Sequence, residues 1–518
     1  MKDTQHRPVR RGRRHGSAAG SETPAAPRSL KYRNLVNPLV RQPAFSADRT
    51  EAIHEAALTA LEELGLRVLD AEARSILREG GAEVDEAAQM VRFDRALVAQ
   101  ALSIAPSRFT LHGGAPDRAV QIGGDAAAFV CVGGPPNVTD IERGRRAGTL
   151  EDTKNLIRLS QHFDVLHLLS PNIESQDVEL NVRHLAVTEA QLTLGDKPLF
   201  VYARGRAQTN DAFAMIRLAR GLTQAEFESA PWCYTVINTN SPRQIDIPMA
   251  RGIIDFARAG QPSLITPFTL AGAMAPVTMA GALMLAHAEA LAGVVLAQMC
   301  RPGAPVVYGS FTSNVDMKSG SPAFGTPEFV KAAFGAGQLA RHVGLPWRGS
   351  VGTASNAPDE QSVWEFLFSC WGSILGGVNV MVHAAGWLEG GLTASYEKFI
   401  LDIEMLQTFA EVFGPLEADD AAIGLEALRE VGPGGHFFAA AHTMARYRDA
   451  FYTPLVSDWR NFGQWSDDGA KTSVQRASGL CKDILRDFTP PPLDVARADA
   501  LTDFVVRRSR EGGALPES

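Results

Sequence analysis

From Ala127 onwards the chain repeats one pattern eight times: a short apolar run, then glycine, proline or asparagine, then a stretch with helical spacing. Continuous apolar strands separated by amphipathic helices indicate a parallel sheet covered by helices. The eight expected strands are Ala128–Val132, Val165–Leu169, Pro198–Tyr202, Cys233–Ile237, Ser263–Pro267, Pro305–Tyr308, Pro346–Ser350 and Val378–Val382. The expected helices cover residues 150–162, 180–194, 208–220, 247–259, 276–300, 326–343, 358–375 and 393–412. Eight such units predict an α/β fold, specifically a (β/α)8 TIM barrel.

An open, doubly wound sheet is the rival topology for these repeats. It would need a phosphate-binding glycine turn, and the sequence contains neither G-x-G-x-x-G nor a P-loop. The closed barrel is therefore the favoured reading.

The segments outside the repeats predict four parts in the chain. Residues 1–44 carry a run of arginines and little that could pack, so we expect a disordered basic tail. Residues 45–125 predict a small N-terminal α+β region. Residues 126–415 form the predicted barrel with the active site, and residues 416–518 predict a helical C-terminal extension.

Composition narrows the class of protein. The net charge is −8, and nucleic-acid binding is not expected because it needs a basic face. The five cysteines are odd in number and form no C-x-x-C pair, which favours a reducing cytoplasm. The longest apolar run, Pro276–Cys300, carries His287 and Glu289 at its centre. We therefore expect a buried helix there and no membrane span.

The residues just past the strands indicate the chemistry, because barrel active sites lie at the carboxyl ends of the strands. This ring is polar, aromatic and nearly neutral, so it does not fit phosphate or divalent-ion handling. H-E-x-x-H and G-x-S-x-G are absent, and we predict no protein-bound metal. The candidate substrate-binding residues are Arg204, Asn238, Asn240, Phe268, Tyr308, Phe311, Asn314 and Trp387.

Aromatic side chains are the most suggestive members of this ring. Tyr202, Phe268, Tyr308, Phe311 and Trp387 fall at or just beyond predicted strand ends. Aromatic faces attract quaternary ammonium groups. The alternative is that each ring simply packs under a loop.

Several long motifs resemble the trimethylamine methyltransferase family, and the likeness runs from about residue 45 to 487. They are Ala271-Gly272-Ala273-Met274-Ala275-Pro276-Val277-Thr278, Ala288-Glu289-Ala290-Leu291-Ala292-Gly293, Pro302-Gly303-Ala304-Pro305-Val306-Val307-Tyr308-Gly309, and Glu430-Val431-Gly432-Pro433-Gly434-Gly435-His436-Phe437 with His442-Thr443. The resemblance implies a barrel and methyl transfer from a methylated amine to the Co(I) of a corrinoid on a separate small protein. The founding members use pyrrolysine, whereas this sequence has standard residues only, so it resembles the branch that includes glycine betaine methyltransferases.

Within this resemblance a betaine is the expected substrate, and its carboxylate needs donors. Arg204, Asn238, Asn240 and Asn314 are candidates, with a rim salt bridge as the alternative role for Arg204. Tyr308, Phe311 and Trp387 are candidates for an ammonium cage. The candidate catalytic residues are His383 and His442, which could contact corrinoid or polarise substrate, or be structural.

Two other functions remain open at this point. One is a non-enzymatic betaine-binding or sensing module. The other is a lyase or hydrolase on the same barrel that acts on methylated amines. The expected partners are the amine and a corrinoid protein, with a homo-oligomeric, cytoplasmic enzyme that binds neither membrane nor nucleic acid.

Overall fold

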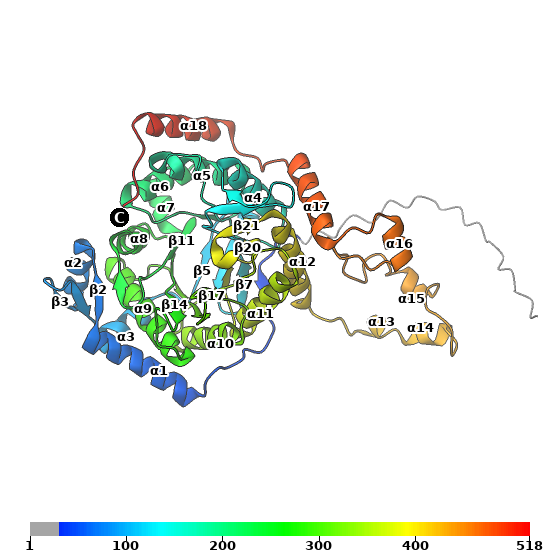
Figure 1. The fold of residues 1–518 in the computed structure, drawn as a ribbon, viewed down its shortest axis with the longest axis horizontal. Coiled ribbons are helices and arrows are strands. Elements are labelled where there is room, and N and C mark those ends of the chain that lie inside the picture. Colours follow the sequence, from blue (N-terminus) through cyan, green and yellow to red (C-terminus); the bar gives the residue numbers. More distant parts are fainter. Residues whose placement is uncertain (1–30, 518) are drawn as a thin grey trace, which may run out of the picture.

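The main sheet has seven parallel strands and one short antiparallel strand in the computed structural model, which describes residues 31–517. The strand order is β1-β7-β19-β18-β15-β13-β11-β10. The strands are β1 (Leu35–Val36), β7 (Ala126–Phe129), β10 (Leu199–Phe200), β11 (Cys233–Ile237), β13 (Ser263–Ile265), β15 (Val306–Gly309), β18 (Trp347–Ser350) and β19 (Val380–Val382). The fold is thus mixed α/β with a curled, mainly parallel sheet, and seven of the eight predicted strands are confirmed (Figure 1).

The predicted strand Val165–Leu169 is wrong as a strand. Its Leu168 forms a single parallel bridge with Val130. The His167 N–H donates to the Phe129 carbonyl at 2.9 Å, and the Leu169 N–H donates to the Pro198 carbonyl at 2.8 Å. This segment therefore contacts both β7 and the approach to β10, but without a continuous ladder.

Eight helices surround the sheet close to where the periodicity predicts them (Figure 1). They are α4 (Leu150–His162), α5 (Leu180–Leu194), α6 (Arg206–Arg220), α8 (Ile247–Arg258), α9 (Met279–Cys300), α10 (Pro327–His342), α11 (Glu360–Gly376) and α12 (Tyr396–Val412). Thr149 and Asp152 form a capping box at the start of α4. Thr278 caps α9, so this helix begins later than expected.

Helix α9 is apolar on every side because it is covered on every side. It contacts α1 (Ala47–Thr59) and α3 (Arg95–Ile104) as well as α8, α10 and the sheet. By length and composition alone, α9 is the one helix in the described part of the chain that could cross a membrane, yet most of it is buried inside the fold. A helix enclosed on all faces has no need of a polar stripe.

The N-terminal region adds a small mixed unit to this side of the molecule. After α1 come the π-helical turn Ala60–Leu64, β2 (Leu66–Val68), α2 (Ala71–Glu79), β3 (Glu83–Asp85), β4 (Met90–Arg92) and α3. Strand β12 (Gln244–Ile245) pairs with β2 and joins the unit to the main body. Of the predicted disordered tail, residues 1–30 lie outside the described residues, while β1 within residues 31–44 pairs with β7.

The C-terminal residues split into two packed helices and a protruding segment. Helix α17 (Ser473–Asp487) contacts α4 and α12, and α18 (Val495–Arg510) contacts α5 and α6. Figure 1 shows the segment between α12 and α17 standing out from the body. We call residues 414–472 the arm, and it contains α13 (Asp420–Ile423), α14 (Leu425–Glu430), α15 (Ala441–Met444) and α16 (Phe462–Asp467).

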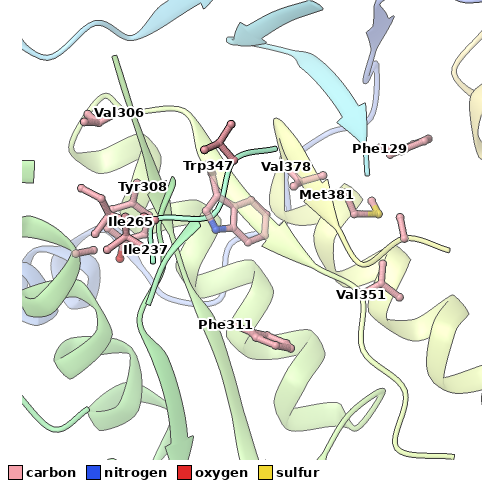
Figure 2. Packing of buried hydrophobic residues seen from close by; sticks show 14 of the residues in the cluster. Phe129, Ile237, Ile265, Val306, Tyr308, Phe311, Trp347, Val351, Val378 and Met381 are labelled. Atoms are coloured by element: carbon pink, nitrogen blue, oxygen red, sulfur yellow. The ribbon is translucent and has the colours of Figure 1, made fainter. Parts of the chain in front are cut away.

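Strand register divides the core into an outer and an inner layer. Ile237, Ile265 and Tyr308 are paired in register on neighbouring strands and cluster together in Figure 2. They lie against the helices, as the contact of the Tyr308 hydroxyl with His287 of α9 shows. Side chains point alternately to the two faces of a strand. The residues that alternate with these three along the strands, such as Leu264 and Val307, therefore point inward. They belong to an inner cluster of buried residues, which are Leu111, Val120, Ile122, Ala128, Val130, Leu168, Tyr234, Leu264, Val307, Val380 and Val382.

Candidate active site

A cavity of about 610 Å³ opens at the carboxyl ends of the strands. This is where ligand sites form in parallel α/β sheets. Its walls come from almost every strand-to-helix connection, so residues far apart in the sequence meet there. The lining residues that matter below are Phe200, Tyr202, Arg204, Tyr234, Asn238, Asn240, Phe268, Phe311, Arg348, His383 and Trp387.

A second, small mixed sheet places two of the aromatic rings. Strands β14 (Phe268–Ala271) and β16 (Phe311–Val315) lie beyond β13 and β15 and pair in register. Phe268 and Phe311 are therefore neighbours, with ring centroids 5.1 Å apart. Phe311 also stacks on Phe324 at 5.3 Å, which holds its ring in place.

Trp387 reaches the same aromatic group from another sheet. It belongs to β20 (Trp387–Leu388), which pairs with β21 (Thr393–Ser395). Its ring centroid is 6.1 Å from that of Phe311 and 3.9 Å from that of His383. Phe268, Phe311, His383 and Trp387 thus form one wall of rings, which we call the aromatic wall.

A second set of rings lines the cavity from β10 and β11. The Phe200 centroid lies 4.9 Å from Tyr202 and 5.3 Å from Tyr234, in edge-to-face contacts. The cavity is therefore bounded by aromatic surface from two groups of strands. Such surface suits an apolar or quaternary ammonium ligand.

The charges around the cavity are positive. Among the described residues that line it there is no aspartate or glutamate, whereas Arg204 and Arg348 both reach it. A cation bound here would not meet a carboxylate from the lining. Favourable electrostatics for a bound cation must therefore come from the ring quadrupoles or from an anionic group of the ligand itself.

Arg204 is already paired. Its guanidinium donates to the two Glu174 carboxylate oxygens at 2.6 and 3.1 Å, and its centre lies 4.2 Å from the Tyr202 ring centroid. This is the rim salt bridge that the sequence left as the alternative. The two terminal nitrogens, Nη1 and Nη2, that could bind a substrate carboxylate are therefore already engaged.

Arg348 is the charged lining residue that was not predicted from the sequence, and the rings of Phe200 and Tyr234 were not predicted either. It lies on β18 between Trp347, which is in register with Tyr308 on the outer face, and Gly349, so its side chain points inward. It is 1% exposed, and its Nε and Nη1 atoms have no hydrogen-bond partner among the described residues. Burial lowers the pKa of Arg348 to about 9, so the side chain is still charged at neutral pH. A charged residue in the middle of a strand predicted to be buried, Pro346–Ser350, was the available sequence signal.

His383 follows β19 in a left-handed backbone conformation with φ of 63°. Its Nδ1 lies 2.8 Å from the Ser350 hydroxyl oxygen. Burial, and then the charge of Arg348, lower the pKa of His383 well below its ordinary value. The ring is thus neutral and serves as a polar, non-ionic member of the aromatic wall.

The two predicted asparagines also line the cavity. The Asn238 amide donates to the Thr266 carbonyl at 3.1 Å. Asn240 exchanges hydrogen bonds with Asp246, which caps α8. Both side chains help to shape the loops while presenting a polar edge to the cavity.

Three predicted site residues lie elsewhere. Tyr308 is fully buried on the outer face of β15, 3.0 Å from His287 Nδ1. Asn314 accepts a hydrogen bond from the Thr326 hydroxyl at 3.2 Å and does not line the cavity. His442 lies on the arm, where its Nε2 is 3.0 Å from the Ala421 carbonyl oxygen. Tyr308 is off the cavity because of strand alternation, which residue counting at a strand end does not resolve.

A protein-bound metal finds no ligand set in the described residues. No group of three or more histidine, cysteine, aspartate or glutamate side chains is placed to hold an ion there. The polar groups at the cavity are amides, hydroxyls, arginines and one neutral imidazole. This donor set binds organic groups and anions.

A parallel sheet with an aromatic cavity at the carboxyl ends of its strands defines a small-molecule-binding α/β protein. Residues 10–513 match the model of the trimethylamine methyltransferase (MTTB) family. The chain belongs to this family and is a methyltransferase.

Individual relatives also align with this chain over most of its length. A glycine betaine methyltransferase of Desulfitobacterium hafniense strain Y51 is 33% identical over 471 residues, which cover 90% of this chain and 98% of the relative. A trimethylamine methyltransferase of Desulfitobacterium hafniense strain DSM 10664 / DCB-2 is 30% identical over 90% of this chain and 94% of its own length. The crystal structure of the Methanosarcina barkeri monomethylamine methyltransferase superposes with a TM-score of 0.47 at 10% identity, covering 86% and 93% of the two chains.

Proposed function

We propose that this enzyme transfers a methyl group from a quaternary amine, such as glycine betaine or a related betaine, to the Co(I) of a corrinoid carried by a separate protein. The observation that carries the proposal is the cavity itself: aromatic walls, no carboxylate, and no paired acid and base among the described lining residues. The relative named glycine betaine methyltransferase supports the same substrate class.

The chemistry requires little from the protein. The bond between the methyl carbon and nitrogen breaks, its electron pair stays on nitrogen, and a neutral tertiary amine leaves. The electron pair of Co(I) forms the new bond to the methyl carbon. Because the leaving group is neutral, neither a general acid nor a nucleophilic side chain is needed. The residues need only hold the methyl group in line and exclude water.

The aromatic wall would supply that positioning. Ring faces attract a quaternary ammonium through their quadrupoles, more strongly where water is excluded. Neutral His383 fits this role because a charged ring would repel the cation. Phe268 and Phe311 are fixed by strand pairing and stacking, so the wall is already formed before substrate binds.

We further propose that the main sheet closes into a (β/α)8 barrel. The contacts of residues 167–169 with Phe129 and Pro198 support closure between β7 and β10. We also propose a cytoplasmic enzyme, which is consistent with five cysteines that are all free thiols. We also propose a homo-oligomer, because the arm exposes large apolar side chains such as Phe438 and Phe451.

A methyl-transfer assay tests the function. Purified enzyme is mixed with chemically reduced cob(I)alamin and a panel of quaternary and tertiary amines, and the visible spectrum is followed as Co(I) becomes methyl-Co(III). We expect methylation with a betaine and none with trimethylamine, which is mostly protonated at neutral pH and has a poor leaving group. Silence across the panel, repeated with the cognate corrinoid protein and with ligand binding established, would contradict the proposal.

One substitution links this activity to the aromatic wall. Trp387→Leu removes a ring from the cavity, whereas Trp364→Leu removes a half-exposed ring from α11. We expect Trp387→Leu to lower kcat/KM roughly 3- to 30-fold, from the cation–π energies of desolvated rings. Trp364→Leu should leave it unchanged.

A further inference from the structure

We infer that Arg348 binds the carboxylate of the substrate and restricts the enzyme to quaternary amines that also carry an anionic group. This inference rests on the proposed function and deepens it. It assigns carboxylate recognition to a residue inside the sheet and not to Arg204 at the rim. A zwitterionic betaine fits such a site, and choline, which has a hydroxyl in place of the carboxylate, does not.

The first support is the position of Arg348. The centre of its guanidinium lies 5.5 Å from the Phe311 ring centroid, and Phe311 belongs to the aromatic wall. A methylated ammonium on the wall and a carboxylate on Arg348 would therefore occupy neighbouring parts of one cavity. Betaines have both groups within one small molecule.

The second support is the missing partner. Buried charges in proteins are normally paired and hydrogen-bonded, because an isolated one is strongly destabilised. In the described part of the chain Arg348 forms no ion pair, and its buried Nε and Nη1 have no acceptor. A guanidinium offers a planar fork that matches a carboxylate with two parallel hydrogen bonds. A bound carboxylate would supply both the charge and the acceptors that the protein leaves out.

The third support is the charge of the cavity. Its described lining contains two arginines and no acidic side chain, and Glu174 already neutralises Arg204. The unbalanced positive charge belongs to Arg348. A ligand that carries only a cation would increase that imbalance, whereas a zwitterion cancels it locally.

Isothermal titration calorimetry tests the inference independently of the methyl-transfer reaction. Glycine betaine and choline are titrated into the wild-type protein and into Arg348→Met, Arg348→Lys and Arg204→Gln. We expect Arg348→Met to weaken betaine binding roughly 10- to 100-fold, the range for a charge-assisted hydrogen-bonded pair. The same variant should bind choline at least as tightly as the wild type does. The betaine affinity of Arg348→Lys should lie between those of the wild type and Arg348→Met, because an ammonium keeps the charge but cannot form two parallel hydrogen bonds.

A matched control excludes a general effect of losing a buried arginine. Arg220 is also largely buried, with an unpartnered Nη2, but it lies outside the cavity. Arg220→Met should bind betaine as the wild type does. Arg348→Met should also melt at no lower temperature than the ligand-free wild type, since it removes an uncompensated buried charge. An unchanged circular dichroism spectrum shows that the variant is folded.

Several outcomes would overturn the inference. They are unchanged betaine binding by Arg348→Met, equal wild-type affinity for choline and betaine, and loss of betaine binding in Arg204→Gln alone. Failure of the inference is distinguishable from failure of the proposed function. Cobalt methylation by choline but not by betaine refutes only the role of Arg348. Betaine binding that depends on Arg348, without cobalt methylation by any amine, refutes only the transfer reaction.

Discussion

His167 joins the first described residues to the sheet through a neutral ring. Its Nδ1 accepts from the Phe129 N–H at 3.1 Å, so its Nε2 carries the proton and donates to the Arg33 carbonyl at 3.0 Å. The Tyr32 hydroxyl donates to the His167 carbonyl at 2.8 Å. Burial is the largest cause that lowers the pKa of His167, to about 4. A second proton on this ring would break the bond with Phe129.

This pKa makes the stability of the protein depend on pH. The unfolded chain binds a proton at His167 near pH 6.5, but the folded chain does so only near pH 4. The contribution is therefore complete above pH 6.5 and is lost as the pH falls from 6.5 towards 4. Between pH 6.5 and 5 the loss is about 2 kcal/mol. Urea unfolding at these two pH values should show a smaller difference for His167→Gln than for the wild type, and parallel losses would refute this account.

Glycines determine how closely two helices of the outer layer approach. Helices α10 and α11 contact each other along their length, and Gly337 of α10 faces the backbone of Gly376. A Cβ atom at Gly337 would lie 2.1 Å from the Gly376 carbonyl oxygen. A backbone atom cannot move aside as a flexible side chain can. The close packing of these two helices therefore requires glycine at position 337.

Replacing Gly337 with alanine should therefore destabilise the protein. We expect a loss of about 1–3 kcal/mol or more, because the two helices must separate. Gly479 in α17 is the matched control, since a Cβ there meets nothing within 4 Å. Gly479→Ala should raise stability by about 0.5–1 kcal/mol through its higher helix propensity. The free energy of unfolding in urea measures both changes, and equal effects would contradict the argument.

The arm leaves many large apolar side chains in solvent. Phe438 and Phe451 are each 81% exposed and Leu416 is 95% exposed, and further exposed apolar residues of the arm are Ile423, Leu425, Leu428, Met444, Trp459 and Phe462. Apolar surface gathered on one segment marks an interaction site far more often than scattered single residues do. A second copy of the chain is the partner we propose for the arm, which would make the enzyme a homo-oligomer.

Sedimentation velocity tests this assembly. The double variant Phe438→Ser, Phe451→Ser should shift the wild-type oligomer towards the monomer while the circular dichroism of the sheet-and-helix body is retained. Val495→Ser on α18 removes an exposed apolar residue outside the arm and should leave the oligomer intact. A wild-type protein that sediments as a monomer would refute the proposal.

The positions of the elements were determined by local sequence, because helix periodicity, caps and breaker residues act over a few neighbours. The predicted helix 180–194 has the observed bounds of α5, and the strand Cys233–Ile237 is β11 unchanged. The same local signals placed Arg204, Asn238, Asn240, Phe268, Phe311, His383 and Trp387 at strand ends, and these residues all line the cavity.

The tertiary structure decided which strand-end residues face the cavity and which partners they meet there, because these depend on strand register and on packing between distant segments. Tyr308 sits at a strand end as predicted, yet the register with Ile265 turns it towards α9. No local sequence signal distinguishes the roles of Arg204 and Arg348. In the folded protein Arg204 pairs with Glu174, whereas Nε and Nη1 of Arg348 have no partner among the described residues. His442 follows the motif Glu430–Phe437 that resembles the family. It does not line the cavity of its own chain, because it lies on the arm. Pairings between residues far apart in the sequence depend on packing, which no local pattern encodes.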